Sequence, residues 1–190
     1  MYNIVIVGVG GQGTLLASKI LGQLAMNNGY DVRVSEVHGM SQRGGDVQSH
    51  LRLSSNEIAS DLIPEGKADM IISVEPMEAL RYLPMLSKNG VIITASEPFI
   101  NIDNYPEVEK VYEELKKHNA IIVDADTIAK ECGNIRAANM VIFGAAVPSL
   151  EIDMQTIENS IRKQFGSKGE EVVELNLKAV KAGFEQATKK

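Results

Sequence analysis

The amino-acid sequence predicts a three-layer α/β domain in which helices cover both faces of a doubly wound, mainly parallel sheet. Two observations favour this fold class. Short apolar runs without polar alternation recur along the chain, which is typical of strands buried on both faces. Most of these runs are separated by stretches with helical periodicity, and strands that alternate with helices form parallel sheets. The 190 residues contain no internal repeat or linker, so we expect a single domain over residues 1–190.

The first predicted strand and helix open the fold. Residues 3–7, NIVIV, form an apolar run that predicts an internal strand of the sheet. The glycine-rich segment 8–13 follows directly. Leucine and isoleucine then recur every four positions over residues 16–24, which predicts one apolar face of a helix that ends at residues 28–29.

The next two strands are expected to form an antiparallel hairpin over residues 31–37 and 46–53. The connection at residues 38–45 is too short for the helical crossover that parallel neighbours need. The second of these strands alternates with a period of two, so it is expected to be half exposed. Its polar face would then carry Asp46, Gln48, His50 and Arg52.

The remaining elements complete the sheet and its covering helices. Strands are expected at residues 69–75, 91–95 and 120–124, with helices that begin at Pro76 and Pro106. Two apolar stripes predict further helices, and residues 138–147 form a helix that is apolar nearly all round. That helix is therefore expected to be buried or to lie at an interface. The stripes consist of Ile157, Ile161 and Phe165, and of Val173, Leu177, Val180 and Phe184.

The composition argues against several classes of protein. A formal net charge of −6 and few clustered basic residues disfavour nucleic-acid binding. No apolar run approaches the roughly 20 residues of a membrane span, and residues 1–9 do not resemble a signal peptide. The single cysteine, Cys132, can form neither an internal disulfide nor an iron–sulfur site of about four thiolates. We therefore expect a reduced, cytoplasmic setting without a membrane or nucleic acid as partner.

The glycine-rich segment between the first strand and the first helix is a candidate phosphate site. Its G-x-G-x-x-G spacing lets backbone N–H groups and a helix N-terminus hold an anion, or else serves only a tight turn and close packing. Glu36 lies 23 residues beyond Gly13 (36 − 13), near where an acid would bind the ribose of NAD. The candidate cofactor-binding residues are Gly8, Gly10, Gly11, Gln12 and Gly13.

The connection between the hairpin strands is the second candidate site. Arg43 can bind a carboxylate or phosphate through two hydrogen bonds, and Ser41 and Gln42 can add more. The glycines at the end of this segment let another molecule approach the backbone. A plain hairpin turn with an exposed arginine is the alternative. The candidate partner or substrate-channel residues are Glu36, His38, Ser41, Gln42, Arg43, Gly44, Gly45 and His50.

Other acidic residues are weaker candidates. Asp124 and Asp126 lie between a strand and a helix, where capping the helix is favoured over metal binding. Glu75 and Glu97 each precede a proline at a strand end, so both are expected at the same rim of the sheet. We predict no metal site and no catalytic residue on this chain alone.

Two segments resemble a known family. Residues 8–13, GVGGQG, and residues 36–45, EVHGMSQRGG, are similar to the gamma-type domain of 2-oxoacid:ferredoxin oxidoreductases. The second segment resembles the indolepyruvate enzymes of that family in particular. Asn139 and Gly144 also match, and the resemblance extends over the whole chain in length and element order.

The resemblance implies a subunit of an enzyme that oxidatively decarboxylates a 2-oxoacid, with coenzyme A and ferredoxin as co-substrates. It also implies a larger alpha subunit that carries thiamine diphosphate, magnesium and iron–sulfur clusters, while this chain binds no cofactor tightly and is inactive alone. The sequence agrees, because it has one cysteine and no Gly-Asp-Gly motif for thiamine diphosphate. Whether the isolated chain forms a homodimer stays open.

Two other readings of the sequence remain. The chain could be a free-standing sensor module for a nucleotide or coenzyme A, or an NAD-dependent dehydrogenase that acts alone. The second is disfavoured, since the chain shows no substrate domain and no positioned acid–base pair. A neighbouring reading frame rich in CxxCxxC motifs would favour the subunit.

Overall fold

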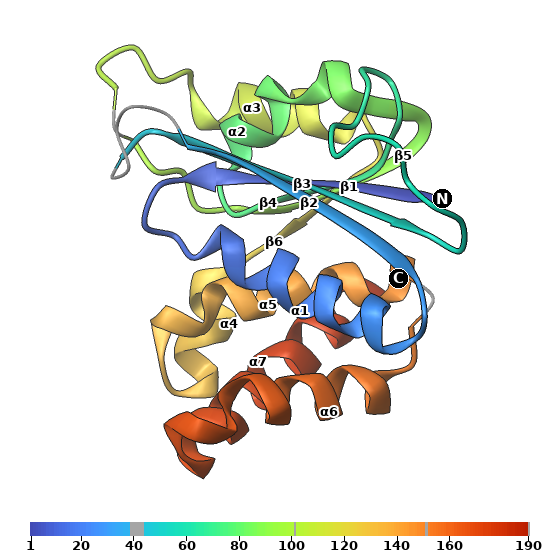
Figure 1. The fold of residues 1–190 in the computed structure, drawn as a ribbon. Helices are drawn as coiled ribbons and strands as arrows, with labels where there is room; N and C mark the ends of the chain where they lie inside the picture. Colours follow the sequence, from blue (N-terminus) through green and yellow to red (C-terminus); the bar gives the residue numbers. More distant parts are fainter. Residues whose placement is uncertain (39–43, 101, 151, 190) are drawn as a thin grey trace.

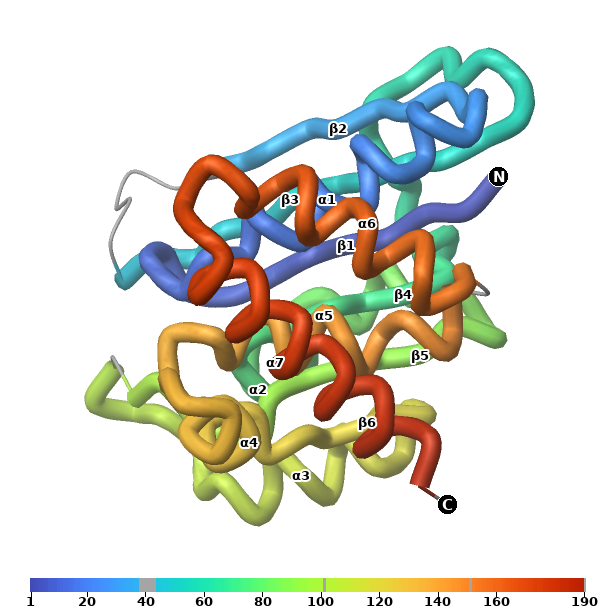
Figure 2. The backbone as a smooth tube through the Cα atoms, turned by 90° about the horizontal axis from the view of Figure 1, so that it is seen from below, coloured from blue at the N-terminus to red at the C-terminus, as the bar shows by residue number. Residues whose placement is uncertain are grey.

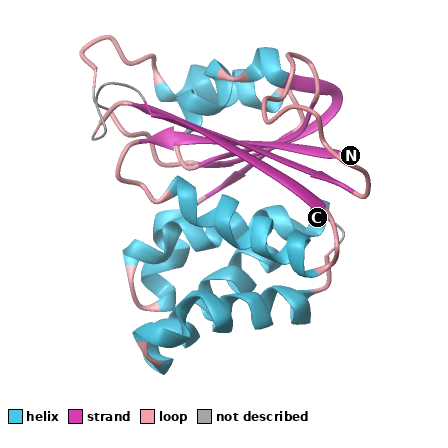
Figure 3. Cartoon of the chain, viewed as in Figure 1, coloured by secondary structure: helices cyan, strands magenta, loops and turns pink. Residues whose placement is uncertain are grey.

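The fold is a six-stranded sheet between two layers of helices. A computed structural model describes residues 1–38, 44–100, 102–150 and 152–189. Figures 1 and 3 show the sheet edge-on, with helices above and below it, which confirms the predicted α/β fold class. Among the described residues, no helix combines the length and the apolar character that crossing a bilayer requires.

The strand order is β2-β3-β1-β4-β5-β6. β1 is internal, and β1, β4, β5 and β6 run parallel, while β3 pairs antiparallel with both β1 and β2. The internal first strand and the antiparallel hairpin are both confirmed. The bounds are β1 Tyr2–Val9, β2 Asp31–His38, β3 Asp46–Ser54, β4 Ala68–Ser73, β5 Leu86–Ala95 and β6 Ala120–Val123.

The helices divide unequally between the two faces of the sheet. Figure 1 shows α2 and α3 on one face and α1, α4, α5, α6 and α7 on the opposite face, where α6 and α7 lie outside α1 and α5. Figure 2 views the molecule from that helical side. The bounds are α1 Thr14–Asn27, α2 Pro76–Arg81, α3 Val108–Lys116, α4 Ala125–Cys132, α5 Ala138–Ala146, α6 Met154–Phe165 and α7 Glu170–Thr188.

α5 lies in the centre of the core, as its apolar sequence predicts. Residues 140–146 are all buried, and Phe143 has no exposed surface. α5 touches α7 through two glycines: a Cβ atom built on Gly144 would lie 2.1 Å from the Val180 carbonyl oxygen, and one on Gly183 would lie 2.0 Å from that of Val141. The backbones of α5 and α7 therefore meet without intervening side chains.

The prediction that β3 is half exposed is wrong. His50 and Arg52 are only 6% and 8% exposed, because the chain segment 55–64 folds over this face of the sheet. The Ile63 amide donates to His50 Nδ1 at 3.0 Å, and Arg52 Nη1 donates to the carbonyl oxygens of Ser60 and Leu62 at 2.8 and 3.0 Å. The polar residues of β3 thus hold a covering segment in place, since buried polar groups need hydrogen-bond partners.

Candidate functional site

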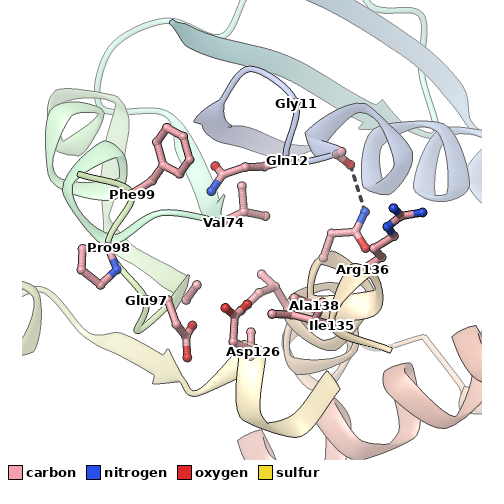
Figure 4. Close-up of a pocket in the computed structure, with 15 residues that line it drawn as sticks. Gly11, Gln12, Val74, Glu97, Pro98, Phe99, Asp126, Ile135, Arg136 and Ala138 are labelled. Atoms are coloured by element: carbon pink, nitrogen blue, oxygen red, sulfur yellow. Dashed lines mark hydrogen bonds between the residues drawn. The ribbon is translucent and has the colours of Figure 1, made fainter. Parts of the chain in front are cut away.

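A cavity of about 510 Å³ lies at the carboxyl ends of the parallel strands. Figure 4 shows side chains and loops from β1, β4, β5 and the start of α4 converging on it. Open α/β sheets bind ligands at this edge, because the loops that follow neighbouring parallel strands meet there. The lining includes Gly11, Gln12, Gly13, Val74, Glu97, Phe99, Asp126, Arg136 and Asn139.

The glycine-rich segment forms one wall of the cavity. Gly11 and Gly13 have φ values of +105° and +77°, a left-handed conformation that glycine adopts without a steric penalty. The Gln12 side chain turns back and accepts a hydrogen bond from the Val9 amide at 2.8 Å. Gly8 has a packing role instead, because a Cβ atom there would lie 2.3 Å from Val74 Cγ2.

The amides of this segment are divided between internal hydrogen bonds and the cavity. The Gly10 amide donates to the Gly45 carbonyl oxygen at 2.8 Å, and the Gln12 amide donates to that of Val9 at 3.2 Å. Within the described part of the chain, the amides of Gly11 and Gly13 make no hydrogen bond. α1 also lacks a side-chain cap and an acidic residue in its first turn. Its N-terminus therefore keeps the donors and partial positive charge that suit an anion.

One residue at the start of α5 and one just before it complete this wall. Asn139 Nδ2 lies 3.4 Å from the Gly13 carbonyl oxygen, and the dashed line in Figure 4 marks this contact. Arg136 lines the cavity from the short helical turn Ile135–Ala137 that precedes α5. The sequence analysis did not identify Arg136, because no local pattern reveals that residues over 120 positions beyond the glycine-rich segment lie beside it.

Acidic residues form the opposite wall. Figure 4 shows Glu97 and Asp126 across the cavity from Gly11 and Gln12. Burial, and then a hydrogen bond with Asp124, raises the pKa of the Glu97 carboxyl group. The same hydrogen bond lowers the pKa of Asp124, whose Oδ1 accepts from the Thr127 amide at 3.1 Å. Asp124 therefore caps α4 as predicted, and the described residues contain no cluster of three metal-ligating side chains.

Glu75 does not line the cavity, although Glu97 does. Glu75 is 1% exposed and caps α2, with its Oε2 accepting from the Glu78 amide at 2.7 Å. Its Oε1 accepts from the Phe99 amide at 3.3 Å and from the Tyr105 hydroxyl group. Glu75 thus lies beneath the rim and fastens the segment that places Phe99 at the cavity.

The end of the hairpin connection lies against the glycine-rich segment. The Gly44 amide donates to the Gly10 carbonyl oxygen at 3.3 Å, opposite the Gly10–Gly45 bond. The structure thus brings Gly44 and Gly45 together with the first candidate site. Ser41, Gln42, Arg43 and the side chain of His38 lie outside the described residues.

Glu36 and His50 do not belong to this cavity. Glu36 is exposed on β2, with β3 between it and β1, so it is about 10 Å from β1 at ~4.8 Å per strand. A ribose-binding acid would stand on a strand adjacent to the glycine-rich turn, so this position disfavours the NAD reading. His50 is buried beneath the segment 55–64, which contradicts the expectation that it continues an exposed partner surface.

Comparison with known proteins gives consistent matches over nearly the whole chain. A family model described as pyruvate ferredoxin/flavodoxin oxidoreductase matches residues 3–186. The chain is 41% identical over 195 aligned positions to the indolepyruvate oxidoreductase subunit IorB of Archaeoglobus fulgidus, covering 97% of this chain and 94% of that protein.

Solved structures share the fold. The gamma subunit of a keto/oxoacid ferredoxin oxidoreductase from Geobacter sulfurreducens superposes with a TM-score of 0.73 at 25% identity, covering 98% of both chains. A 2-oxoglutarate:ferredoxin oxidoreductase from Magnetococcus marinus gives a TM-score of 0.76 at 21% identity. There the match covers 98% of this chain but 31% of the other, so the same fold forms one part of a longer chain.

Proposed function

Because this chain belongs to the pyruvate ferredoxin/flavodoxin oxidoreductase family, we propose that it is the small subunit of an indolepyruvate:ferredoxin oxidoreductase. Its family membership confirms the resemblance carried by residues 8–13 and 36–45. Indolepyruvate is proposed as the substrate because the chain is 41% identical to an indolepyruvate oxidoreductase subunit over nearly the full length of both proteins. The complex would decarboxylate the 2-oxoacid, transfer its acyl group to coenzyme A and pass the released electrons to ferredoxin.

Iron–sulfur clusters do not fit this chain. Cys132 is its only cysteine, whereas an iron–sulfur cluster is normally held by about four thiolates. We therefore assign thiamine diphosphate, magnesium and the iron–sulfur clusters to a larger partner subunit. The longer Magnetococcus chain, of which this fold forms a part, is consistent with such a partner.

The role that remains for this chain is to bind and position. The unpaired amides of Gly11 and Gly13, the N-terminus of α1 and Arg136 favour an anionic group in the cavity. A phosphate group of coenzyme A has the required charge. This chain would then present a co-substrate at the face of the complex where the partner carries out the chemistry.

The experiment that tests this proposal is co-purification. The chain should be produced with and without the large-subunit product of a neighbouring reading frame rich in cysteine motifs. We expect a stable, coloured complex from the pair and a colourless chain alone, because iron–sulfur clusters absorb visible light. A chain that stays separate from that product and binds a nucleotide tightly alone would favour the sensor module instead.

We predict that Arg43→Ala lowers turnover of the assembled enzyme by about tenfold, equivalent to ~1.4 kcal/mol. The substitution should shift the stability of the isolated chain by no more than ~0.5 kcal/mol, since we expect Arg43 to be exposed and substitutions of exposed residues change stability little. The two quantities are measured by steady-state kinetics of the complex and by thermal unfolding of the chain. Unchanged turnover, or unfolding of the isolated variant, would remove Arg43 from the functional site.

A further inference from the structure

The acidic wall of the cavity contains a buried oxygen atom without a hydrogen-bond donor. Glu97 Oε1 accepts from the Ser96 hydroxyl group at 2.9 Å. Glu97 Oε2 is buried, and no N–H or O–H group of the described residues donates to it. The only group hydrogen-bonded to the Glu97 carboxyl beyond its own segment is another carboxyl, that of Asp124, among the residues that the structure describes.

A hydrogen bond between two carboxyl groups requires a proton on one of them, because ionised carboxylates only accept. Of the two carboxyl groups, that of Asp124 is more strongly stabilised in its ionised form. Its Oδ1 already accepts from the Thr127 amide at the N-terminus of α4, where the helix dipole favours negative charge. Glu97 is half-buried beside Phe99 and Pro98 on the cavity wall. The proton therefore belongs on Glu97, which donates to Asp124.

We propose that Glu97 is a neutral carboxylic acid in this cavity, held so by Asp124, and that its neutrality allows the cavity to accept an anionic group. This inference rests on the proposed anion site at the glycine-rich segment. With Glu97 ionised, the wall opposite Gly11 would carry the negative charges of Glu97, Asp124 and Asp126. Those charges would oppose the attraction from Arg136 and the α1 N-terminus.

Burial and the neighbouring carboxyl groups favour the neutral form of Glu97, whereas hydrogen bonds from the Ser96 hydroxyl group and from its own backbone favour the ionised form. Arg136 also lines the cavity. Asp124 and Asp126 face it from the start of α4. On the α3 side, Tyr112 donates its hydroxyl proton to the Ser96 carbonyl oxygen, and Glu109 lies near Tyr112. Glu75 also acts on Tyr112, and it accepts a hydrogen bond from the Tyr105 hydroxyl group. Asp124 and Asp126 raise the pKa of Glu97, whereas Glu75 and Glu109 act on Tyr112.

The expected pH dependence follows from that direction. Glu97 is fully protonated below the ordinary glutamate pKa, and it loses its proton as the pH rises through its raised pKa. Anion binding should weaken over the same interval. The stability that the neutral acid contributes to the fold should fall there too, because the folded chain binds this proton more tightly than the unfolded chain.

Sulfate is the probe, because it stays doubly charged over the whole pH range. Any change in its affinity therefore reports a change in the protonation of the protein. Binding to the full chain is measured by calorimetry between about pH 4 and pH 9, a range that begins near the ordinary carboxyl pKa. We expect the wild-type affinity to fall about fivefold, or ~1 kcal/mol, across the range. Glu97→Gln, a neutral isostere, should keep the low-pH affinity throughout. Asp124→Asn still caps α4, but should move the fall to lower pH, since its amide can donate to ionised Glu97.

Glu109→Gln is the matched control, since Glu109 is exposed on α3 and should leave the profile unchanged. The protonation of Glu97 is read independently from the titration of its ¹³C-labelled carboxyl carbon, assigned by its loss in Glu97→Gln. An ordinary pKa in that titration, or equal pH dependence in wild type and Glu97→Gln, would overturn the inference. If sulfate does not bind at any pH, the proposal that the cavity accepts an anionic group is wrong. Neither result changes co-purification with the larger subunit, which tests the proposed function separately.

Discussion

Replacing Gly183 with alanine is expected to lower the free energy of unfolding by about 3 kcal/mol. A Cβ atom at this position would lie 2.0 Å from the Val141 carbonyl oxygen and 3.0 Å from the Ala145 amide nitrogen. These are backbone atoms of α5, so the clash is relieved only if α5 and α7 move apart in the centre of the core. The change is measured by urea denaturation monitored by circular dichroism.

The sign of this effect is diagnostic. In a free helix, replacing glycine by alanine stabilises by about 1 kcal/mol, because alanine loses less backbone entropy on folding. Gly166→Ala is the matched control, since Gly166 has a helical φ of −54° and nothing within 4 Å of its added Cβ atom. The control should be neutral or slightly stabilising. A stabilised Gly183→Ala chain would mean that α5 and α7 do not approach as closely as described.

Replacing Arg52 with leucine is expected to destabilise the chain by about 3 kcal/mol. The Arg52 guanidinium group is buried and donates to Asn3 Oδ1 at 3.0 Å and to the carbonyl oxygens of Ser60 and Leu62. Leucine leaves these buried acceptors without donors. The segment 55–64 should then open, which faster amide exchange of Ile63 would report, because that amide is held by His50 Nδ1.

Arg33→Leu provides the comparison for this effect. Arg33 is paired with Arg52 in the register of β2 and β3, but its side chain is 39% exposed. The same substitution there should change stability by less than ~0.5 kcal/mol. Equal effects at both positions would indicate that removing positive charge, rather than losing the hydrogen bonds of Arg52, destabilises the chain.

Local sequence patterns predicted the elements that depend on local physics. The apolar run at residues 3–7 indicated an internal strand, and the short connection at residues 38–45 indicated an antiparallel hairpin. The order and directions of β1, β2 and β3 confirm both. Asp124 was identified as a helix cap for the same reason, since capping involves neighbours within three residues.

Features that depend on distant contacts were not predicted. The alternation of β3 could not reveal that residues 55–64 cover its polar face, because a satisfied buried arginine and an exposed one give the same pattern. Arg136 and the Glu97–Asp124 pair join the site only through the packing of α5 against α1, β4 and β5 and through the pairing of β6 with β5. Gly183 has no local signal either, because only the position of α5 makes it necessary.

The central claim, that this chain is the small subunit of an indolepyruvate:ferredoxin oxidoreductase, is tested most directly by reconstitution. The purified chain is mixed with its separately purified large subunit, and ferredoxin reduction is followed with indolepyruvate and coenzyme A supplied. We predict activity that requires both subunits and saturates at equal amounts of the two, with none from this chain alone. Full activity of the large subunit by itself, or turnover by this chain alone, would contradict the account.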